Sequence, residues 1–600
     1  MTTTAEAISN GSVDPVMMSV LSNRLDGIVR EMSNTLLKAA RSTVIAIARD
    51  FSCAIVTYDN QLLAAAEGLP IHIFGADLMC EAMTRLHPGL AEGDAFIHND
   101  PYLGGSHAAD QTILVPVFIE GKHLFTVCVK AHQADIGNSI PTTYHLTARD
   151  VYEEGAVIFP CMKLQSQGKM IEDVIRLGMT RIRVPQQWYG DLLAAVGSAR
   201  IGEKRLKALC EKYSRASIKH FISAWFDYSE QRAIQAIAAL PAGTVENEAA
   251  LDPFPPVIED PIPVRVKVTV DPVQGRITVD LRDNIDCLPC GLNQSEACAI
   301  SSAMIGIFNC LDPDLPQNAG SFRRLRVLLR DGAIVGKVKH PFSASVATTA
   351  ISDYLVSTTQ SAIAKLGYGY GISDISAGGS YGAAVVSGRD SRYDNEPYVN
   401  QLCLFVGGGP ASAHADGWAT YAEPVVNGLI YRDSIELDEL KHPLLIDHLR
   451  LVPDSGGAGY RRGGLALDIE YGPRQDPITL VGCSSGVIPG KGVHGGHPGR
   501  LGVCRYKKND GTPSQLPYPM LMLQPGETVS TIESSGGGYG YPHLREPERV
   551  LNDVLSSAVT VDAAYEIYQV VLVGRIEDES LAVDITATDQ LRAAHGSMPK

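Results

Sequence analysis

The sequence predicts an α+β protein in which multiple layers of antiparallel sheet carry inserted helical segments. Two observations favour this class. Short runs rich in β-branched and aromatic residues recur along the chain between tight turns, which indicates antiparallel hairpins. Long stretches with apolar residues at spacings of three and four lie between them, as is typical of amphipathic helices. The 600-residue length is enough for several cores of roughly 150 residues each.

The first predicted domain, residues 1–250, mixes helices with strands. Its first helix begins at Asp14-Pro15, an N-cap followed by proline, and continues as a single apolar stripe. Glu120-Gly121-Lys122 marks the turn between the two strongest strand-like runs. The predicted elements are, in order, a helix over 14–48, a hairpin over 51–66, a helix over 75–86, strands over 95–100, 112–120 and 123–132, and helices between 150 and 240.

Two further domains are predicted after a proline-rich connector at 251–264. The central α/β region, 251–450, begins with a hairpin that turns at Gln274-Gly275 and continues with a helix of small residues over 295–312. The last region, 451–600, is glycine-rich and strand-like and ends with helices over 547–555 and from 561 onward.

Two glycine-rich stretches, 454–464 and 532–542, look at first like phosphate-binding loops. Neither is followed by Gly-Lys-Ser/Thr as in a Walker loop, and neither opens a strand–GxGxxG–helix unit. Glycine there favours turns and close backbone packing, with a loop that closes over substrate or contacts a partner as the alternative. We therefore expect no familiar ATP pocket in this chain.

The composition argues against several classes of function. The chain carries 51 Lys+Arg against 67 Asp+Glu, a formal net charge of −16, whereas nucleic acids and anionic membranes require clustered positive charge. No run of about 18 apolar residues predicts a membrane span, and the N-terminus lacks the pattern of a secretory signal. We expect a cytoplasmic protein with no nucleic-acid or membrane partner.

The 12 Cys lie mostly inside apolar runs, which is typical of reduced, buried thiols. One pattern suggests metal binding: Cys287 and Cys290 form a Cys-x-x-Cys pair and are followed by Cys298 and Cys310. The second pair is widely spaced in an apolar stretch, which favours packed thiols and leaves metal or redox use as the alternative.

The densest chemistry lies between residues 98 and 135, where two His-x-x-Asp units begin at His107 and His132. If the strands on either side turn at Gly121, residues equally far from it along the chain face each other, and Asp110 therefore pairs with His132. His107 lies just before the first of these strands and can curl back. Imidazole nitrogen and carboxylate oxygen without thiolate suit Zn, Mn or Fe.

Other acidic and histidine residues have structural alternatives. Asp50 begins a strand and can face a cleft, which makes it a further candidate ligand. Asp100 precedes proline and could act in catalysis or simply cap a tight turn. His132 could be a structural strand-end histidine. The apolar surroundings of His72 favour a core histidine, with support of a metal ligand as the alternative.

Several motifs in fixed order resemble one known family. They cover the chain from about residue 15 to 570 and include RDFSCAIVTYDN, FIHNDPYLGGSHAADQTILVPVF, AHQADIGN, RVPQQWYGDLLAAVGSARIGEKRL, DSGGAGYRRGG and SSGGGYGYPHLREPERVLNDV. The chain is similar to the hydantoinase B family, which includes the B-type subunit of N-methylhydantoinase, the C-terminal part of 5-oxoprolinase, caprolactamase, and acetone and acetophenone carboxylases.

The resemblance implies a hydantoinase B-like fold and a hetero-oligomer. The B-type subunit works with an A-type subunit of actin-like fold, which binds ATP and phosphorylates an oxygen of a cyclic amide or a ketone enolate. A divalent metal is implied at Asp50, His107, Asp110 and His132. In that setting we expect Asp135 to orient a ligand histidine.

The resemblance leaves three hypotheses open. The first is a subunit of an ATP-dependent cyclic-amide hydrolase, with Asp100 as a general base. The second is a subunit of an ATP-dependent ketone carboxylase, and the third is a non-catalytic scaffold copy in such a complex. The sequence departs from the common family pattern at Gln133, Asn138, Leu440 and Lys441, which bears on the substrate class more than on the fold.

Overall fold

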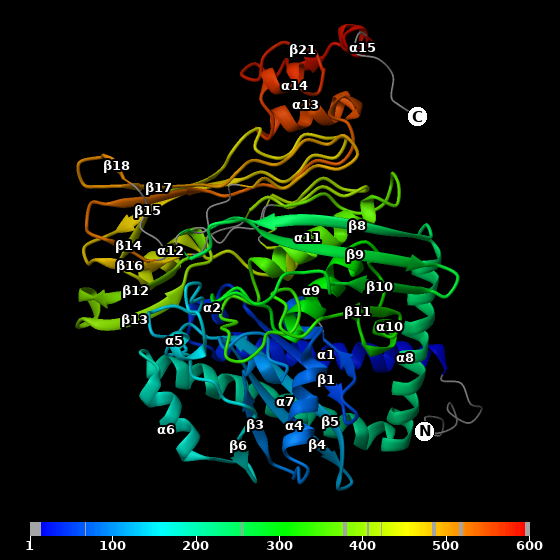
Figure 1. The fold of residues 1–600 in the computed structure, drawn as a ribbon, viewed down its shortest axis with the longest axis vertical. Helices are drawn as coiled ribbons and strands as arrows, with labels where there is room; N and C mark the ends of the chain where they lie inside the picture. Colours follow the sequence, from blue (N-terminus) through cyan, green and yellow to red (C-terminus); the bar gives the residue numbers. More distant parts are fainter. Residues whose placement is uncertain are drawn as a thin grey trace.

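Layers of largely antiparallel sheet, packed with helices, build the computed structural model (Figure 1), which confirms the predicted class. It describes residues 14–593, apart from 66–67, 254, 256, 376–380, 405–406, 420, 422, 483–487 and 515–519. The described strands form one seven-stranded, two four-stranded, one five-stranded and one two-stranded sheet. No helix in the described part of the chain combines the length and apolar character that crossing a membrane requires.

The seven-stranded sheet has the order β2-β1-β5-β4-β3-β6-β7 and is antiparallel throughout. Its strands are β1 (Phe51–Thr57), β2 (Leu62–Ala64), β3 (Ala95–His98), β4 (Asp110–Ile119), β5 (Lys122–His132), β6 (Met162–Ser166) and β7 (Lys169–Met170). Every residue of β1 is buried, because both faces of the sheet are covered. That is why its strands appear in the sequence as continuous apolar runs instead of alternating ones.

Two cores lie on opposite faces of this sheet. Ile55, Val115 and Val127 pack with the stripe of α1 (Pro15–Ala39) and with α7 (Pro185–Tyr213), while Val56 and Leu114 face the other core. The first face also carries α6 (Glu172–Arg181) and α8 (Arg215–Ala238), and the second carries α4 (Ala76–Leu86) and α9 (Glu296–Phe308). Each β-branched side chain thereby finds an apolar partner on its own side.

The first helix is shorter than predicted. It begins at the predicted cap, where the Asp14 side chain accepts the backbone N–H of Val16, but it ends at Ala39 and is followed by the separate short α2 (Thr43–Ala46). The break has a local cause, because the carboxylate of Asp191 on α7 accepts the backbone N–H groups of Arg41 and Ser42. A residue far along the chain thus satisfies the donors that a continuous helix would have used.

The next sheet begins after the predicted connector and has the order β11-β10-β9-β8. Its strands are β8 (Gly243–Leu251), β9 (Ile262–Asp271), β10 (Arg276–Asp280) and β11 (Leu325–Leu328). The β9–β10 hairpin confirms the predicted turn, and β11 joins β10 in parallel. Helix α11 (Ile351–Ala364), whose residues are all buried, packs on β8 and β9 and on α9.

The two remaining large sheets lie between this region and the C-terminal end (Figure 1). One consists of β12 (Val385–Asp390), β13 (Glu396–Gln401), β16 (Ile478–Val481) and β19 (Met520–Leu523). The other consists of β14 (Leu444–Leu451), β15 (Leu467–Pro473), β17 (Val503–Lys507), β18 (Pro513–Ser514) and β20 (Thr528–Ile532). Helix α12 (Ile435–Lys441) contacts β14.

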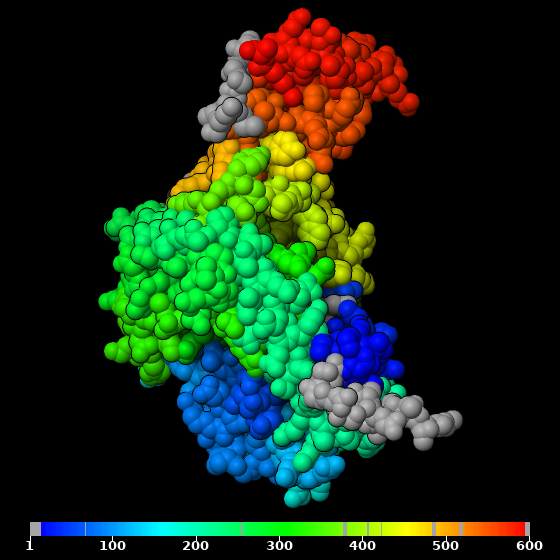
Figure 2. Space-filling model, turned by 90° about the vertical axis from the view of Figure 1, so that its right-hand side faces the viewer, coloured from blue at the N-terminus to red at the C-terminus, as the bar shows by residue number. Residues whose placement is uncertain are grey.

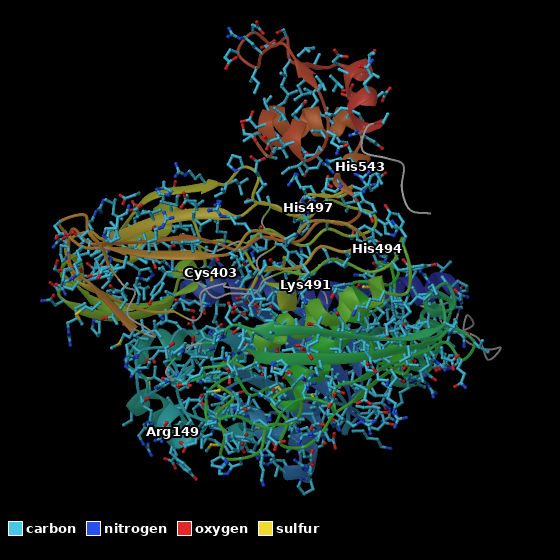
Figure 3. All side chains as sticks on the ribbon, turned by 45° about the horizontal axis from the view of Figure 1, so that its top comes forward. Arg149, Cys403, Lys491, His494, His497 and His543 are labelled. Atoms are coloured by element: carbon cyan, nitrogen blue, oxygen red, sulfur yellow. The ribbon has the colours of Figure 1, made fainter. Side chains whose placement is uncertain are left out.

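Glycine-rich segments around 408–417, 456–464, 492–499 and 535–538 pack backbone against backbone. Gly457 N–H donates to Gly536 O, and Gly538 N–H donates to His497 O, each at 2.9 Å (His497 is labelled in Figure 3). A Cβ added to Gly463 would lie 2.0 Å from Gly536 O, which no side chain can accept. This confirms close packing as the role of these glycines.

A C-terminal unit projects from the body of the molecule, at the top of Figure 1 and Figure 2. It contains α13 (Pro547–Leu555), α14 (Val561–Glu566), α15 (Ile585–Ala593) and the short β21 (Leu572–Val573) and β22 (Ala582–Val583) around a small core of its own. Buried Arg545 joins it to the glycine-rich layer, pairing with Asp416 at 2.8 Å and with Asp553 at 2.9 Å.

We predict that Arg545→Met loosens the C-terminal unit by about 3–5 kcal/mol, because both carboxylates then lose a buried partner. Hydrogen exchange measured by mass spectrometry should quicken in α13 to α15. Arg549→Met is the matched control, since Arg549 is exposed and a surface pair contributes less than about 1 kcal/mol. Equal exchange in the two variants would contradict the anchoring role.

Candidate metal centre

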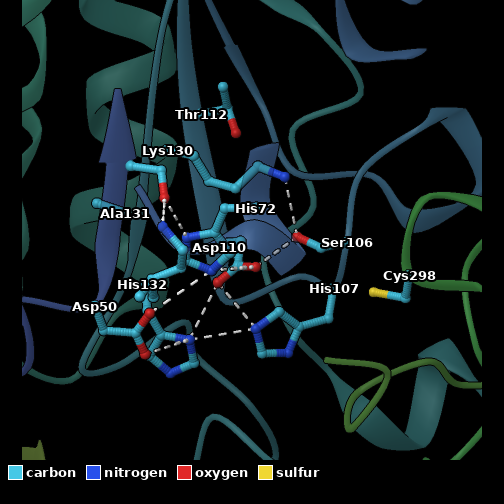
Figure 4. Close-up of polar contacts among 12 residues, drawn as sticks. Asp50, His72, Ser106, His107, Asp110, Thr112, Lys130, Ala131, His132 and Cys298 are labelled. Atoms are coloured by element: carbon cyan, nitrogen blue, oxygen red, sulfur yellow. Dashed lines mark hydrogen bonds and ion pairs between the residues drawn. The ribbon is translucent and has the colours of Figure 1, made fainter. Parts of the chain in front are cut away.

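Strand pairing brings three predicted ligands to one end of the seven-stranded sheet (Figure 4). Asp110 and His132 are direct cross-strand partners of β4 and β5, which confirms the register predicted from the turn at Gly121. Asp50 directly precedes β1 and its carbonyl accepts the backbone N–H of His132 at 3.0 Å. His107 curls back through a turn in which its carbonyl accepts the N–H of Asp110 at 3.2 Å.

The three closest donor atoms lie almost at hydrogen-bond distance from one another. His107 Nε2 is 3.0 Å from Asp110 Oδ1, His132 Nδ1 is 3.2 Å from the same oxygen, and the two nitrogens are 3.2 Å apart. All three side chains are buried. Within the described ranges, this is the one group of three His, Cys, Asp or Glu residues whose ligand atoms are close enough to share a metal ion.

The outer ring nitrogens show which atoms are free to bind a cation. His107 Nδ1 lies 2.8 Å from the carbonyl oxygen of Ser345, so it must carry the hydrogen, and neutral His107 then presents an Nε2 lone pair to Asp110. His132 Nε2 lies 3.1 Å from the hydroxyl of Thr143. Lone pairs of nitrogen and oxygen facing each other in a buried site require a shared proton or cation. The donor set therefore fits a divalent metal of the Zn, Mn or Fe type.

Asp50 and His72 lie beside this triad. Asp50 Oδ2 is 4.0 Å from His132 Nδ1, and Asp50 Oδ1 is 3.6 Å from His72 Nε2. His72 Nε2 is also 3.2 Å from Asp110 Oδ2, which places this histidine of α3 (Pro70–Ile73) against the ligand set instead of in an apolar core. Its apolar neighbours in sequence give no sign of this position.

Three more residues at the site were missed in the sequence. Ser106 donates its hydroxyl to Asp110 Oδ2, and buried Lys130 lies 3.4 Å from the Ser106 hydroxyl (Figure 4). The ring of Tyr144 stacks on both histidines, 5.6 Å from His107 and 5.2 Å from His132 between centroids. Lys130 could have been found, because it lies two positions before His132 on the same face of β5.

The charges of the buried groups are strongly linked. Burial raises the pKa of Asp110, but His107 and His72 outweigh it and hold that pKa well below the usual range. Burial lowers the pKa of His107, yet Asp110 outweighs it and the net shift is upward. Burial raises the pKa of Asp50 to about 6, with Asp110 adding to the rise and His132 and His107 opposing it.

The two predicted catalytic carboxylates lie in other settings. Asp100 accepts the backbone N–H of Tyr102 at 2.8 Å and so caps a short turn, the structural alternative considered for it. Asp135 accepts the N–H of Gly137 and forms an ion pair with Arg183 at 3.1 Å. The contacts of Asp135 are thus not those of a residue that orients a ligand histidine, which corrects the expectation; the Arg183 charge holds its carboxylate instead.

The thiols are packed as expected. The described cysteines are free, and most are buried. Burial raises the pKa of Cys290 and of Cys298 to about 12, so neither is a ready thiolate ligand.

Comparison with known proteins identifies the family. Residues 14–542 match the family described as hydantoinase B/oxoprolinase. The chain belongs to this family. It is 29% identical over 593 residues to the beta subunit of caprolactamase from Pseudomonas jessenii, covering 97% of this chain and all of that protein. It is 27% identical to the B-type subunit of a putative D-/L-hydantoinase from a Pseudomonas strain, covering 97% and 98% of the two chains.

Solved structures in this family share its fold. The ATP-dependent caprolactamase of Pseudomonas jessenii superposes with a TM-score of 0.84 at 27% identity, over 97% of this chain and all of the other. A nucleotide-free acetone carboxylase superposes with a TM-score of 0.80 at 20% identity, over 98% and 84%. The second likeness concerns the fold alone.

We predict that His107→Ala abolishes metal binding in a chain that still folds, a larger loss than the ~10–100-fold typical of removing an outer partner of a ligand. Metal content after dialysis and circular dichroism measure the two effects. His123→Ala is the matched control, because His123 lies on the same hairpin and bonds Thr126. Full metal content in His107→Ala would exclude this residue as a ligand.

Metal retention should depend on pH, because ligands bind metal only when deprotonated. The pKa of Asp50 near 6 in the metal-free chain means that a proton competes for this carboxylate below that pH. We expect full occupancy at pH 8 and release as the pH falls through about 6, measured by elemental analysis after dialysis. Asp50→Asn should bind metal more weakly at pH 8. A retention curve that is flat between pH 8 and pH 5 would contradict this assignment.

Proposed function

We propose that this chain is the B-type subunit of an ATP-dependent cyclic-amide hydrolase. The observation that carries the proposal is the buried triad His107, Asp110 and His132, with Asp50 beside it, in a chain that aligns along its length with the beta subunit of caprolactamase. We assign a divalent metal, Zn, Mn or Fe, to these four residues.

The ATP step belongs to a partner in this proposal. The chain has no Walker loop or dinucleotide fingerprint, and relatives named as subunits support a hetero-oligomer. An A-type subunit would bind ATP and phosphorylate the amide oxygen of the substrate. The B-type chain then receives an activated species and provides the hydrolytic site. Free, mostly buried thiols fit a reducing compartment, so we place the complex in the cytoplasm.

A divalent metal in such a site polarises a bound oxygen or lowers the pKa of a bound water. The residues of this chain arrange the site for that task. The Ser345 carbonyl and the Thr143 hydroxyl hold the two imidazole rings from outside, and the Tyr144 ring covers both of them. Asp100 remains the proposed general base.

The same geometry serves two competing functions. A ketone carboxylase of the same fold would also activate its substrate with ATP, and the acetone carboxylase superposition supports that fold. A scaffold copy would have no need of a complete ligand set, so the intact triad favours catalysis.

The test is a product assay on the complex purified with its A-type partner. With ATP we expect metal-dependent ring opening of caprolactam, a hydantoin or 5-oxoproline, together with release of ADP. ATP hydrolysis that requires both bicarbonate and a ketone, without ring opening, would overturn the proposal in favour of carboxylation. A metal-free chain that does not affect the turnover of its complex would point to a scaffold.

A further inference from the structure

The orientation of His107 depends on a segment far along the chain. The Ser345 carbonyl that accepts the His107 Nδ1 hydrogen at 2.8 Å lies 238 positions away in sequence. Ser345 is 1% exposed and belongs to a loop between β11 and α11. The direction of that carbonyl therefore decides whether His107 Nε2 points at Asp110.

A buried carboxylate holds this loop. The hydroxyl of Ser343 donates to Glu154 Oε2 at 2.6 Å, and the N–H of Ser345 donates to the Ser343 hydroxyl at 3.2 Å. Glu154 is 3% exposed, lies at the end of α5 (Val151–Glu154), and takes part in no ion pair within the described ranges. A carboxylate without a cationic partner is costly to bury, so its bonds to the loop are its main compensation.

The same loop also positions the aromatic wall of the site. The Ser345 hydroxyl accepts the backbone N–H of His145 at 2.9 Å, directly after Tyr144, whose ring stacks on both ligand histidines. The other side of the loop is fixed by Asn293, whose amide donates to the Ser343 carbonyl at 2.9 Å. Loss of the Glu154 contact would therefore release both the His107 acceptor and the support of Tyr144.

We propose that Glu154 is a positioning residue of the metal centre, acting through Ser343 and Ser345 to fix the tautomer and direction of His107. The inference depends on the proposed metal site but on neither the substrate nor the reaction type. It joins the centre to a segment that sequence alone places in a different predicted domain.

The experiment compares Glu154→Gln with Glu153→Gln in the full chain loaded with Zn or Co. Glu153 is the neighbouring residue and pairs with exposed Arg149, so its variant makes the same chemical change outside the relay. We expect Glu154→Gln to release metal to a chelator ~10–100-fold faster, the range for outer-shell partners of a ligand, and to alter the visible spectrum of the Co form. Glu153→Gln should match the wild type in both measurements.

Ser343→Ala provides a second variant if Glu154→Gln folds poorly, and it should release metal at a similarly increased rate. The double variant should add little to either single change, because both interrupt one relay. Release rates and Co spectra of Glu154→Gln and Ser343→Ala equal to wild type would overturn the inference while leaving the metal site intact. A wild-type chain that holds no metal at all would overturn the proposed function and this inference together.

Discussion

Two imidazoles and a carboxylate whose lone pairs face each other at 3.0–3.2 Å in the protein interior need a shared cation or proton. The pairing of β4 with β5 enforces this crowding, because it places Asp110 opposite His132 while the chain before β4 turns His107 back onto them. A shift of one residue in register would send one of the two to the opposite face of the sheet. The register is secured because both faces of this sheet are buried in apolar cores.

The rest of the fold supplies the surroundings of that ribbon. Helices cover one face, and the second core continues through α9 into the later sheets, so strands hundreds of residues away contribute to the packing behind the ligands. The glycine-rich layer achieves with backbone contact what the other layers achieve with side chains, since a Cβ at Gly463 would collide with Gly536 O. Its hydrogen bonds replace the apolar interlocking of an ordinary sheet interface.

Ligand geometry and substrate choice are separable in this family. A caprolactamase and an acetone carboxylase both superpose on this chain, with TM-scores of 0.84 and 0.80. A metal held by histidine and aspartate can activate water or polarise an oxygen in either chemistry. Specificity must therefore come from groups around the ligands, among them Tyr144 and Lys130, and from the species that the partner subunit delivers.

Sequence alone predicts the elements whose signals are local. The N-cap at Asp14, the turn at Gly121 and the helix over 547–555 all follow from short patterns, and the turn also predicts the pairing of Asp110 with His132 because hairpin register is set by neighbours. The family motifs extend this to the fold. Contacts between distant segments leave no periodic signal. His72 against Asp110, Arg183 on Asp135 and the Ser345 carbonyl on His107 arise only when the layers stack, because what each side chain meets there is decided by packing across many residues of sequence.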